Sequence, residues 1–158
     1  MKKQGFTLIE LMVVIVIMGI LAAVAVPKLF GMIAKSKASE VGPAAGEYVK
    51  LSQAYFSETN MFGGWKMIGY NAPNGTAGNT ATTTNFTYKG AITTDATTNE
   101  TTEKAWSATN NAALNDCAKD TEAWTIKAIY STTSDSYEAK VSTTDCEVLT
   151  PSFAQIGK

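Results

Sequence analysis

The fold is decided by residues 6–26, which read FTLIELMVVIVIMGILAAVAV. The last sixteen of these residues, 11–26, contain no charged or strongly polar side chain. As an α-helix, these 21 residues rise about 31 Å, which matches the roughly 30 Å hydrocarbon core of a bilayer. The stretch therefore predicts a single membrane-spanning helix.

The residues around this stretch predict how it lies in the membrane. Lys2 and Lys3 are the charges on its short N-terminal side. The positive-inside rule keeps such lysines in the cytoplasm and sends the rest of the chain outward. Two other interpretations fit the same pattern: a secretory signal peptide that is cut after Ala23-Val24-Ala25, or a membrane anchor that is never cut.

Glu10 is explained by neither of these two alternatives. Its carboxylate lies in the first turns of the apolar helix, where an acidic side chain is costly to place in lipid. Because the apolar stretch contains no cation, we expect the partner of Glu10 to be a positive group on another copy of the chain. A free amine at Phe6 would fill this role.

Residues 2–15, KKQGFTLIELMVVI, closely resemble the class III leader of type IV pilins and of type II secretion pseudopilins. The resemblance implies that a prepilin peptidase removes a leader peptide, residues 1–5, by cutting between Gly5 and Phe6. The same enzyme would then N-methylate the new Phe6 amine. The resemblance also implies that Glu10 neutralises this amine on a neighbouring subunit during assembly.

This resemblance also carries an expected function, that of a type IVa-like major pilin. Such a chain is first a single-pass precursor in the inner membrane, with its N-terminus in the cytoplasm. It then polymerises into a helical homo-oligomer, an extracellular filament for adhesion, twitching motility or DNA uptake. Because the sequence has no nucleotide-binding loop, extension is expected to rely on separate ATPases of the pilus assembly machinery. The alternative is a type II secretion pseudopilin, which forms a periplasmic piston.

The composition argues against several other classes of function. The 158 residues include no histidine, which removes the commonest general base and the commonest metal ligand. We therefore expect no enzyme activity and no catalytic, cofactor-binding or metal site. Thirteen basic residues against fourteen acidic ones leave no basic excess for nucleic acid, so contact with DNA is expected only indirectly, during uptake. An anchored or secreted binding module that uses Trp65 is a third alternative.

Cys117 and Cys146 are the two cysteines of the chain. They lie too far apart for a CxxC redox motif, and two thiols without histidine make a poor zinc site. A disulfide is the simpler interpretation, and it places the domain outside the cytoplasm. Closing a loop of about 30 residues stabilises the fold by roughly 3 to 4 kcal/mol in the chain-entropy model. The pair also resembles the disulfide-bounded region of type IV pilins.

Residues 28–58 predict an amphipathic continuation of the N-terminal helix. Small and aromatic side chains recur at steps of three and four between Ala34 and Tyr55, which is the period of a helix with one buried face. Pro27, Gly42 and Pro43 interrupt this pattern and predict helix kinks. Two separate helices that meet at Gly42-Pro43 are the alternative.

Residues 59–158 are predicted to form a globular head. The Gly-, Asn- and Thr-rich stretch 60–85 predicts a long surface loop, and residues 86–92 predict a first strand. Residues 123–130 and 137–141 alternate apolar and polar side chains, which predicts a hairpin. Because a one-sided sheet needs a cover, the amphipathic helix is expected to pack on it. The expected fold is therefore α+β, a long N-terminal helix on a small antiparallel sheet, as in pilins.

The aromatic residues of the head lead to one further expectation about its surface. Trp65 and Trp106 fall in loop-like stretches and are candidates for stacking on a carbohydrate or another surface ligand, with ordinary loop packing as the alternative. Trp124 alternates with core residues and is predicted to be buried. The Thr- and Asn-rich stretch 93–115 predicts an exposed, hydrophilic filament surface.

Overall fold

A computed structural model describes residues 5–75 and 78–158 of the chain. Most of the expected leader, residues 1–4 with Lys2 and Lys3, lies outside the described residues. The chain divides into two compact units, Met1–Ile33 and Ala34–Lys158. Each unit is described by itself below.

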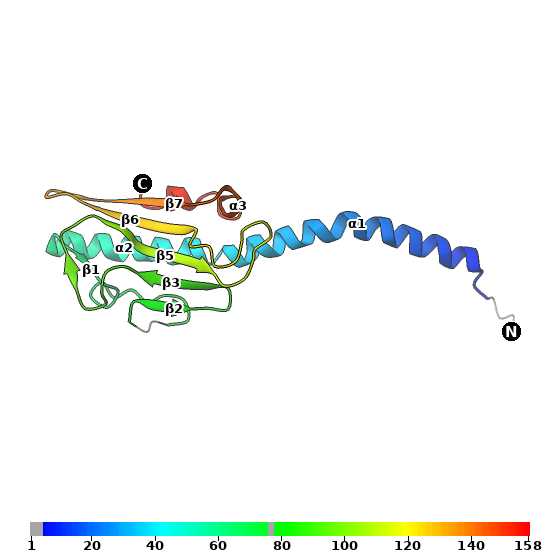
Figure 1. Cartoon of the computed structure of the whole chain (residues 1–158), viewed down its shortest axis with the longest axis horizontal. Helices are drawn as coiled ribbons and strands as arrows, with labels where there is room; N and C mark the ends of the chain where they lie inside the picture. Colours follow the sequence, from blue (N-terminus) through cyan, green and yellow to red (C-terminus); the bar gives the residue numbers. More distant parts are fainter. Residues whose placement is uncertain (1–4, 76–77) are drawn as a thin grey trace. The chain divides into compact units, whose positions relative to one another are not determined.

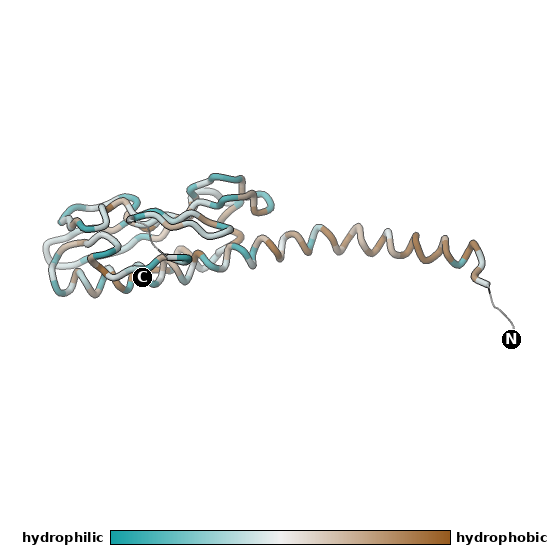
Figure 2. Tube along the Cα trace, turned by 90° about the horizontal axis from the view of Figure 1, so that it is seen from below, coloured by the Kyte–Doolittle hydropathy of each residue, from teal (hydrophilic) through white to brown (hydrophobic). Residues whose placement is uncertain are grey.

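The first unit consists mainly of the helix α1, Leu8–Ala38, whose last turn already belongs to the second unit. Pro27 lies inside this helix. The side chains of residues 8–30 are exposed in the isolated chain, and Figure 2 shows that most of α1 is hydrophobic. A helix with apolar residues on every side cannot bury them against a single neighbour, so α1 requires lipid or other protein chains around it.

The second helix, α2, spans Val41–Thr59 and is amphipathic. Its buried residues recur at steps of three and four, as predicted: Val41, Ala44, Ala45, Tyr48, Val49, Ser52 and Phe56. The helix ends at Asn60, whose backbone is left-handed with φ 56°. The backbone N–H of Asn60 donates to the carbonyl of Phe56 (2.7 Å) and so satisfies one of the last free carbonyls of the helix.

The sheet of the second unit has five antiparallel strands in the order β2-β3-β5-β6-β7 (Figure 1). These strands are β2 Thr80–Thr82, β3 Phe86–Gly90, β5 Thr102–Asn110, β6 Trp124–Tyr130 and β7 Asp135–Val141. A second, two-stranded sheet pairs β1, Phe62–Gly63, with β4, Thr97–Thr98. The predicted α+β fold, a helix packed on an antiparallel sheet, is therefore confirmed.

The predicted C-terminal hairpin is present as β6 and β7. Trp124 faces Val141 and Tyr130 faces Asp135 in the register of the two strands. The connecting turn is closed by the N–H of Ser131, which donates to the carbonyl of Ser134 (3.0 Å). The second strand thus begins two residues earlier than the alternating pattern predicted.

The composition of residues 93–115 predicted an exposed surface. In the structure this stretch is partly buried, so the prediction is wrong for its central part. It contains β5, the longest strand, which lies at the centre of the sheet and is mostly buried from Ala105 to Asn110. Small Ala and Ser side chains fit a crowded central strand, so the Thr- and Asn-rich composition was a poor guide to exposure. The predicted loop 60–85 likewise contains the short strands β1 and β2.

Trp65 and Trp106 are buried, which makes their predicted role in carbohydrate stacking at the surface wrong. Both are at most 1% exposed. The indole of Trp106 donates to the hydroxyl of Tyr70 (3.0 Å), which in turn donates to the carbonyl of Ala44 on α2 (3.1 Å). Trp65 packs on Gly90, where a Cβ would lie 2.6 Å from the indole nitrogen. Trp106 therefore links β5 to α2 through Tyr70, and Trp65 packs the loop after β1 against β3.

The C-terminal segment, residues 142–158, follows β7 in the second unit. A short helix, α3 Thr144–Glu147, follows β7, and a 3₁₀ turn, η1 Phe153–Gln155, packs beside β7. Gly157 has φ 84°, and a Cβ there would lie 2.8 Å from the Cβ of Tyr137. Glycine is therefore needed where the chain passes this strand.

Candidate assembly site

The start of α1 is organised by a pair of reciprocal hydrogen bonds between Thr7 and Glu10. The N–H and the hydroxyl of Thr7 both donate to Oε2 of Glu10 (2.8 and 2.6 Å). The N–H of Glu10 donates back to the Thr7 hydroxyl oxygen (3.3 Å). This is a capping box, in which the residue before the helix and the third helical residue satisfy each other's free N–H groups.

The capping box changes the interpretation of Glu10. From the sequence, its carboxylate was expected to find a partner only on another chain, whereas Thr7 already provides two hydrogen-bond donors. The pattern Thr-x-x-Glu at residues 7–10 was a signal that could have revealed this contact. Thr7 nevertheless carries no positive charge, so the negative charge of Glu10 is held in place without being neutralised.

Gly5 and Phe6 precede the helix and are exposed. Both lie outside helix and strand, and the Phe6 side chain is 89% exposed. The bond between these two residues is therefore accessible in the isolated chain. The capping box begins at the next residue, so a new N-terminus at Phe6 would directly precede the helix start.

The exposed surface of α1 is almost entirely apolar. Nineteen large hydrophobic side chains between Phe6 and Ile33 are exposed, against three in the rest of the described chain. One helical region among the described residues, Leu8–Thr59, is long and apolar enough to cross a membrane. The apolar part of α1 can therefore be stable only in lipid or against other protein surfaces.

The junction between α1 and α2 lies at Ser39 and Glu40, just before Gly42 and Pro43. Pro43 has no N–H to donate to the carbonyl of Ser39, so the helical hydrogen-bond ladder is interrupted there. At Pro27, by contrast, α1 continues without a break. The main discontinuity of the helical region therefore belongs to the second unit and not to the apolar segment.

Glu40 ties this junction to the sheet. Its Oε1 accepts hydrogen bonds from the hydroxyls of Thr83 (2.7 Å) and Tyr88 (2.8 Å), and its Oε2 accepts one from the amide of Asn85 (3.3 Å). Tyr88 is fully buried. Burial, and then the neighbouring Glu40 carboxylate, raise the pKa of Tyr88 well above its usual range, so this hydroxyl remains a hydrogen-bond donor.

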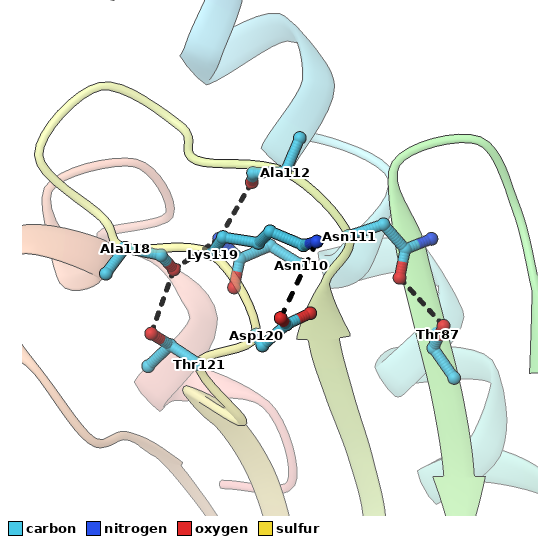
Figure 3. A network of polar contacts seen from close by, with 8 residues as sticks. All are labelled: Thr87, Asn110, Asn111, Ala112, Ala118, Lys119, Asp120 and Thr121. Atoms are coloured by element: carbon cyan, nitrogen blue, oxygen red, sulfur yellow. Dashed lines mark hydrogen bonds and ion pairs between the residues drawn. The ribbon is translucent and has the colours of Figure 1, made fainter.

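Cys117 and Cys146 form the predicted disulfide, with S–S 1.99 Å and Cα atoms 4.8 Å apart. The bond joins the loop after β5 to α3. Figure 3 shows how the same loop is held from inside by Asn110, whose side-chain amide donates to the carbonyls of Ala112 (3.0 Å) and Ala118 (2.7 Å). The loop is therefore fixed both covalently and by buried hydrogen bonds.

No arrangement in the described residues suggests a metal centre. Among residues 5–75 and 78–158, no group of three or more His, Cys, Asp or Glu side chains is placed to hold a metal ion.

Residues 1–26 match a known family, described as the prokaryotic N-terminal methylation motif. The chain is similar to the type IV major pilin protein PilA of Myxococcus xanthus, with 41% identity over 61 residues. It is also similar to the fimbrial protein EcpC of Eikenella corrodens (43% over 60 residues) and to the type IV major fimbrial protein FimA of Dichelobacter nodosus (51% over 45 residues).

These similarities cover only part of each protein. They span 39%, 38% and 28% of this chain, in the same order, and 28%, 39% and 29% of the three relatives. All three relatives are named as pilin or fimbrial proteins. The chain therefore carries the prokaryotic N-terminal methylation motif and is similar, over part of its length, to pilin and fimbrial proteins.

Proposed function

We propose that this chain is the precursor of a structural subunit of a type IV pilus, which polymerises into an extracellular filament. The observation that carries the proposal is the exposed apolar surface of α1 and of Phe6 before it, with nineteen large hydrophobic side chains from Phe6 to Ile33. Relative to exposure in water, burying such a helix against other copies gains tens of kcal/mol at about 25 cal/mol per Å², which is comparable to what the helix gains in lipid. Contacts with other copies can thus replace the lipid that the helix leaves.

The proposed processing starts at the exposed residues before α1. A prepilin peptidase cuts between Gly5 and Phe6 and N-methylates the Phe6 amine. The methylation motif over residues 1–26 supports this step. Removal of residues 1–5 also removes the two lysines that hold the N-terminus in the cytoplasm, which frees the helix for extraction from the membrane.

Glu10 has a proposed role in setting the register between subunits. Its carboxylate is already oriented by Thr7, and in the filament it neutralises the Phe6 amine of a neighbouring copy. An unneutralised carboxylate among apolar helices makes a misaligned neighbour unfavourable, which is the best-attested use of buried polar groups. The capping box pre-orients the acceptor for that amine.

The proposed topology and partners follow from the same features. The precursor spans the inner membrane once with its N-terminus in the cytoplasm, and the disulfide closes on the opposite side. Separate ATPases drive assembly, and the filament serves adhesion, motility or DNA uptake. A type II secretion pseudopilin is not favoured, because the matched relatives are named as major pilins and fimbrial proteins.

The intact mass of this protein in filaments sheared from cells tests the proposal. The expected species contains residues 6–158 with one added methyl group and two hydrogens lost to the disulfide. Gly5→Val should leave the uncut precursor in the membrane fraction, with Gly46→Val, where an added Cβ meets no other atom within 4 Å, as the matched control that is still processed.

Each alternative gives a different mass or location. The processed mass found only in the membrane fraction would point to a pseudopilin. A chain that begins at Met1 or at Val26 would refute the filament subunit and favour the plain anchor or the secretory signal peptide.

A further inference from the structure

A groove of 360 Å³ opens inside the second unit, between the helix junction and the C-terminal segment. Ala38 and Pro43 line it on the helix side, and Leu149, Phe153 and Ile156 line it on the C-terminal side. Ala38, Leu149 and Phe153 are buried and form its floor, while Pro43 is exposed at its rim. None of the lining residues carries a charge.

The groove stays open because the helix side presents little volume. At Gly42 an added Cβ would meet no other atom within 4 Å. The opposite wall is fixed in place, because the Thr150 hydroxyl accepts a hydrogen bond from the buried Trp124 indole (2.7 Å). The packing of the second unit therefore keeps the groove open.

The polar groups of the groove favour an apolar occupant. The Thr150 hydroxyl is engaged by Trp124, and the Ser39 hydroxyl donates to the carbonyl of Ser36 (2.7 Å). Both have partners within the chain, and the exposed Ser152 is the one other hydroxyl side chain of the lining, so the groove offers few polar groups to a sugar or a charged ligand. Mainly apolar surface is left for the occupant.

The chain also contains an apolar segment that, like the groove, has no charged side chain. Residues 11–26 contain no charged side chain, and the large hydrophobic side chains of residues 6–33 are exposed. When an uncharged helix enters an uncharged groove, apolar surface leaves water and no charge has to be desolvated. A charged or strongly polar partner segment would lose hydration without finding a counter-charge.

We propose that the groove of one copy receives apolar side chains from residues 6–33 of a second copy. The proposal rests on the proposed function and names the surface through which the head of a subunit contributes to assembly. Donor and acceptor are different surfaces of the chain, so the contact is heterologous. A heterologous contact that does not close into a ring repeats from copy to copy and produces an open helical filament.

Site-specific photo-crosslinking of the full chain in cells tests the groove. The photoreactive p-benzoylphenylalanine replaces Ser152, an exposed lining residue. The matched control carries it at Ser142, which is exposed and lines a polar, charged depression on the sheet instead. After irradiation, the Ser152 variant should give a cross-linked dimer at least tenfold more abundant than the control. Trypsin should then release the peptide of residues 6–28 or 29–35 attached to the peptide of the C-terminal segment.

A second pair of variants places a charge at the same two positions. Ser152→Asp should lower the yield of sheared filaments at least tenfold, and Ser142→Asp should leave it unchanged. Native tryptophan fluorescence of both variants would establish that the head is folded. A folded Ser152→Asp variant that assembles normally would refute the groove contact.

The outcomes separate the groove from the proposed function. Filaments that form without a cross-link to residues 6–35, or with a cross-link to a phospholipid or to another protein, would refute the groove contact and leave the pilus subunit standing. A cross-link between copies in membranes of cells that make no filaments would retain the groove contact and refute the pilus subunit. If the cells form neither filaments nor the cross-link, both the groove contact and the pilus subunit are refuted.

Discussion

Removal of the Glu40 carboxylate should destabilise the second unit more than removal of any exposed charge on α2. Glu40 is only partly exposed and accepts three hydrogen bonds, from Thr83, Asn85 and Tyr88. A hydrogen bond to a charged group contributes about 1.5 to 3 kcal/mol when buried, and less when partly exposed. Leaving the buried Tyr88 hydroxyl without an acceptor adds a desolvation cost of about 1 to 3 kcal/mol.

Glu40→Ala is therefore expected to lower the free energy of unfolding by about 3 kcal/mol. Glu40→Gln keeps two acceptor lone pairs for Thr83 and Tyr88 and should cost about 1 kcal/mol. The matched control is Glu47→Ala, an exposed residue of α2, for which we expect a change within about 0.5 kcal/mol.

The assay is denaturant unfolding of the full chain in detergent micelles with the disulfide intact, followed by tryptophan fluorescence. All three tryptophans lie in Ala34–Lys158, so the signal reports the second unit alone. A double-mutant cycle with Tyr88→Phe isolates the bond to Glu40 and should give a coupling energy of about 1 to 2 kcal/mol. Additive effects of the two substitutions would refute the assigned bond, and so would an effect of Glu40→Ala no larger than that of Glu47→Ala.

Three further perturbations have defined outcomes. The double substitution of Cys117 and Cys146 by serine should lower the free energy of unfolding by about 3 to 4 kcal/mol, measured by the same denaturant titration; an unchanged midpoint would contradict the loop-closure argument. Thr7→Ala should accelerate amide hydrogen exchange at residues 8–11 several-fold in micelles because the capping box is lost, whereas Thr7→Ser should exchange like the wild type; equal exchange in both variants would remove the role of the hydroxyl. Burial raises the pKa of the Tyr88 and Tyr137 hydroxyls above the ordinary value of 10, so both favour folding below that pH. Stability should fall as the pH rises above about 10, by up to about 1.4 kcal/mol per pH unit for each tyrosine. Tyr88→Phe should flatten this decline, and a stability curve identical to that of the wild type would contradict the assignment.

Two elements were predictable because their signals are local. The buried face of α2 follows from apolar side chains spaced three and four residues apart. The β6–β7 hairpin follows from alternating apolar and polar side chains on either side of a polar turn. Neither depends on residues far away in the chain. The disulfide was predictable for a different reason, because the two cysteines are the only pair that the chain can form.

The central strand β5 was missed because its position is set by its neighbours and not by its own pattern. Its residues Ala105 to Ala108 are buried in succession, without the alternation of a one-sided strand. The pairing register with β6 also shifts between Thr102 and Trp106. β5 lies between two other strands and contains small and polar side chains, a composition that is also typical of loops.

Three features could be predicted directly from the sequence: the apolar helix, the expected cleavage position between Gly5 and Phe6, and Glu10 as the one acidic residue of the apolar stretch. They depend only on composition and on spacing along one helix. Other features became visible only in the folded chain: Trp65 and Trp106 are buried, Glu40 is bound by the sheet, and an uncharged groove opens beside Pro43. These contacts join residues from 25 to more than 100 positions apart. No local sequence pattern indicates contacts between residues so far apart in the chain. These contacts form only when the helix and the sheet pack together.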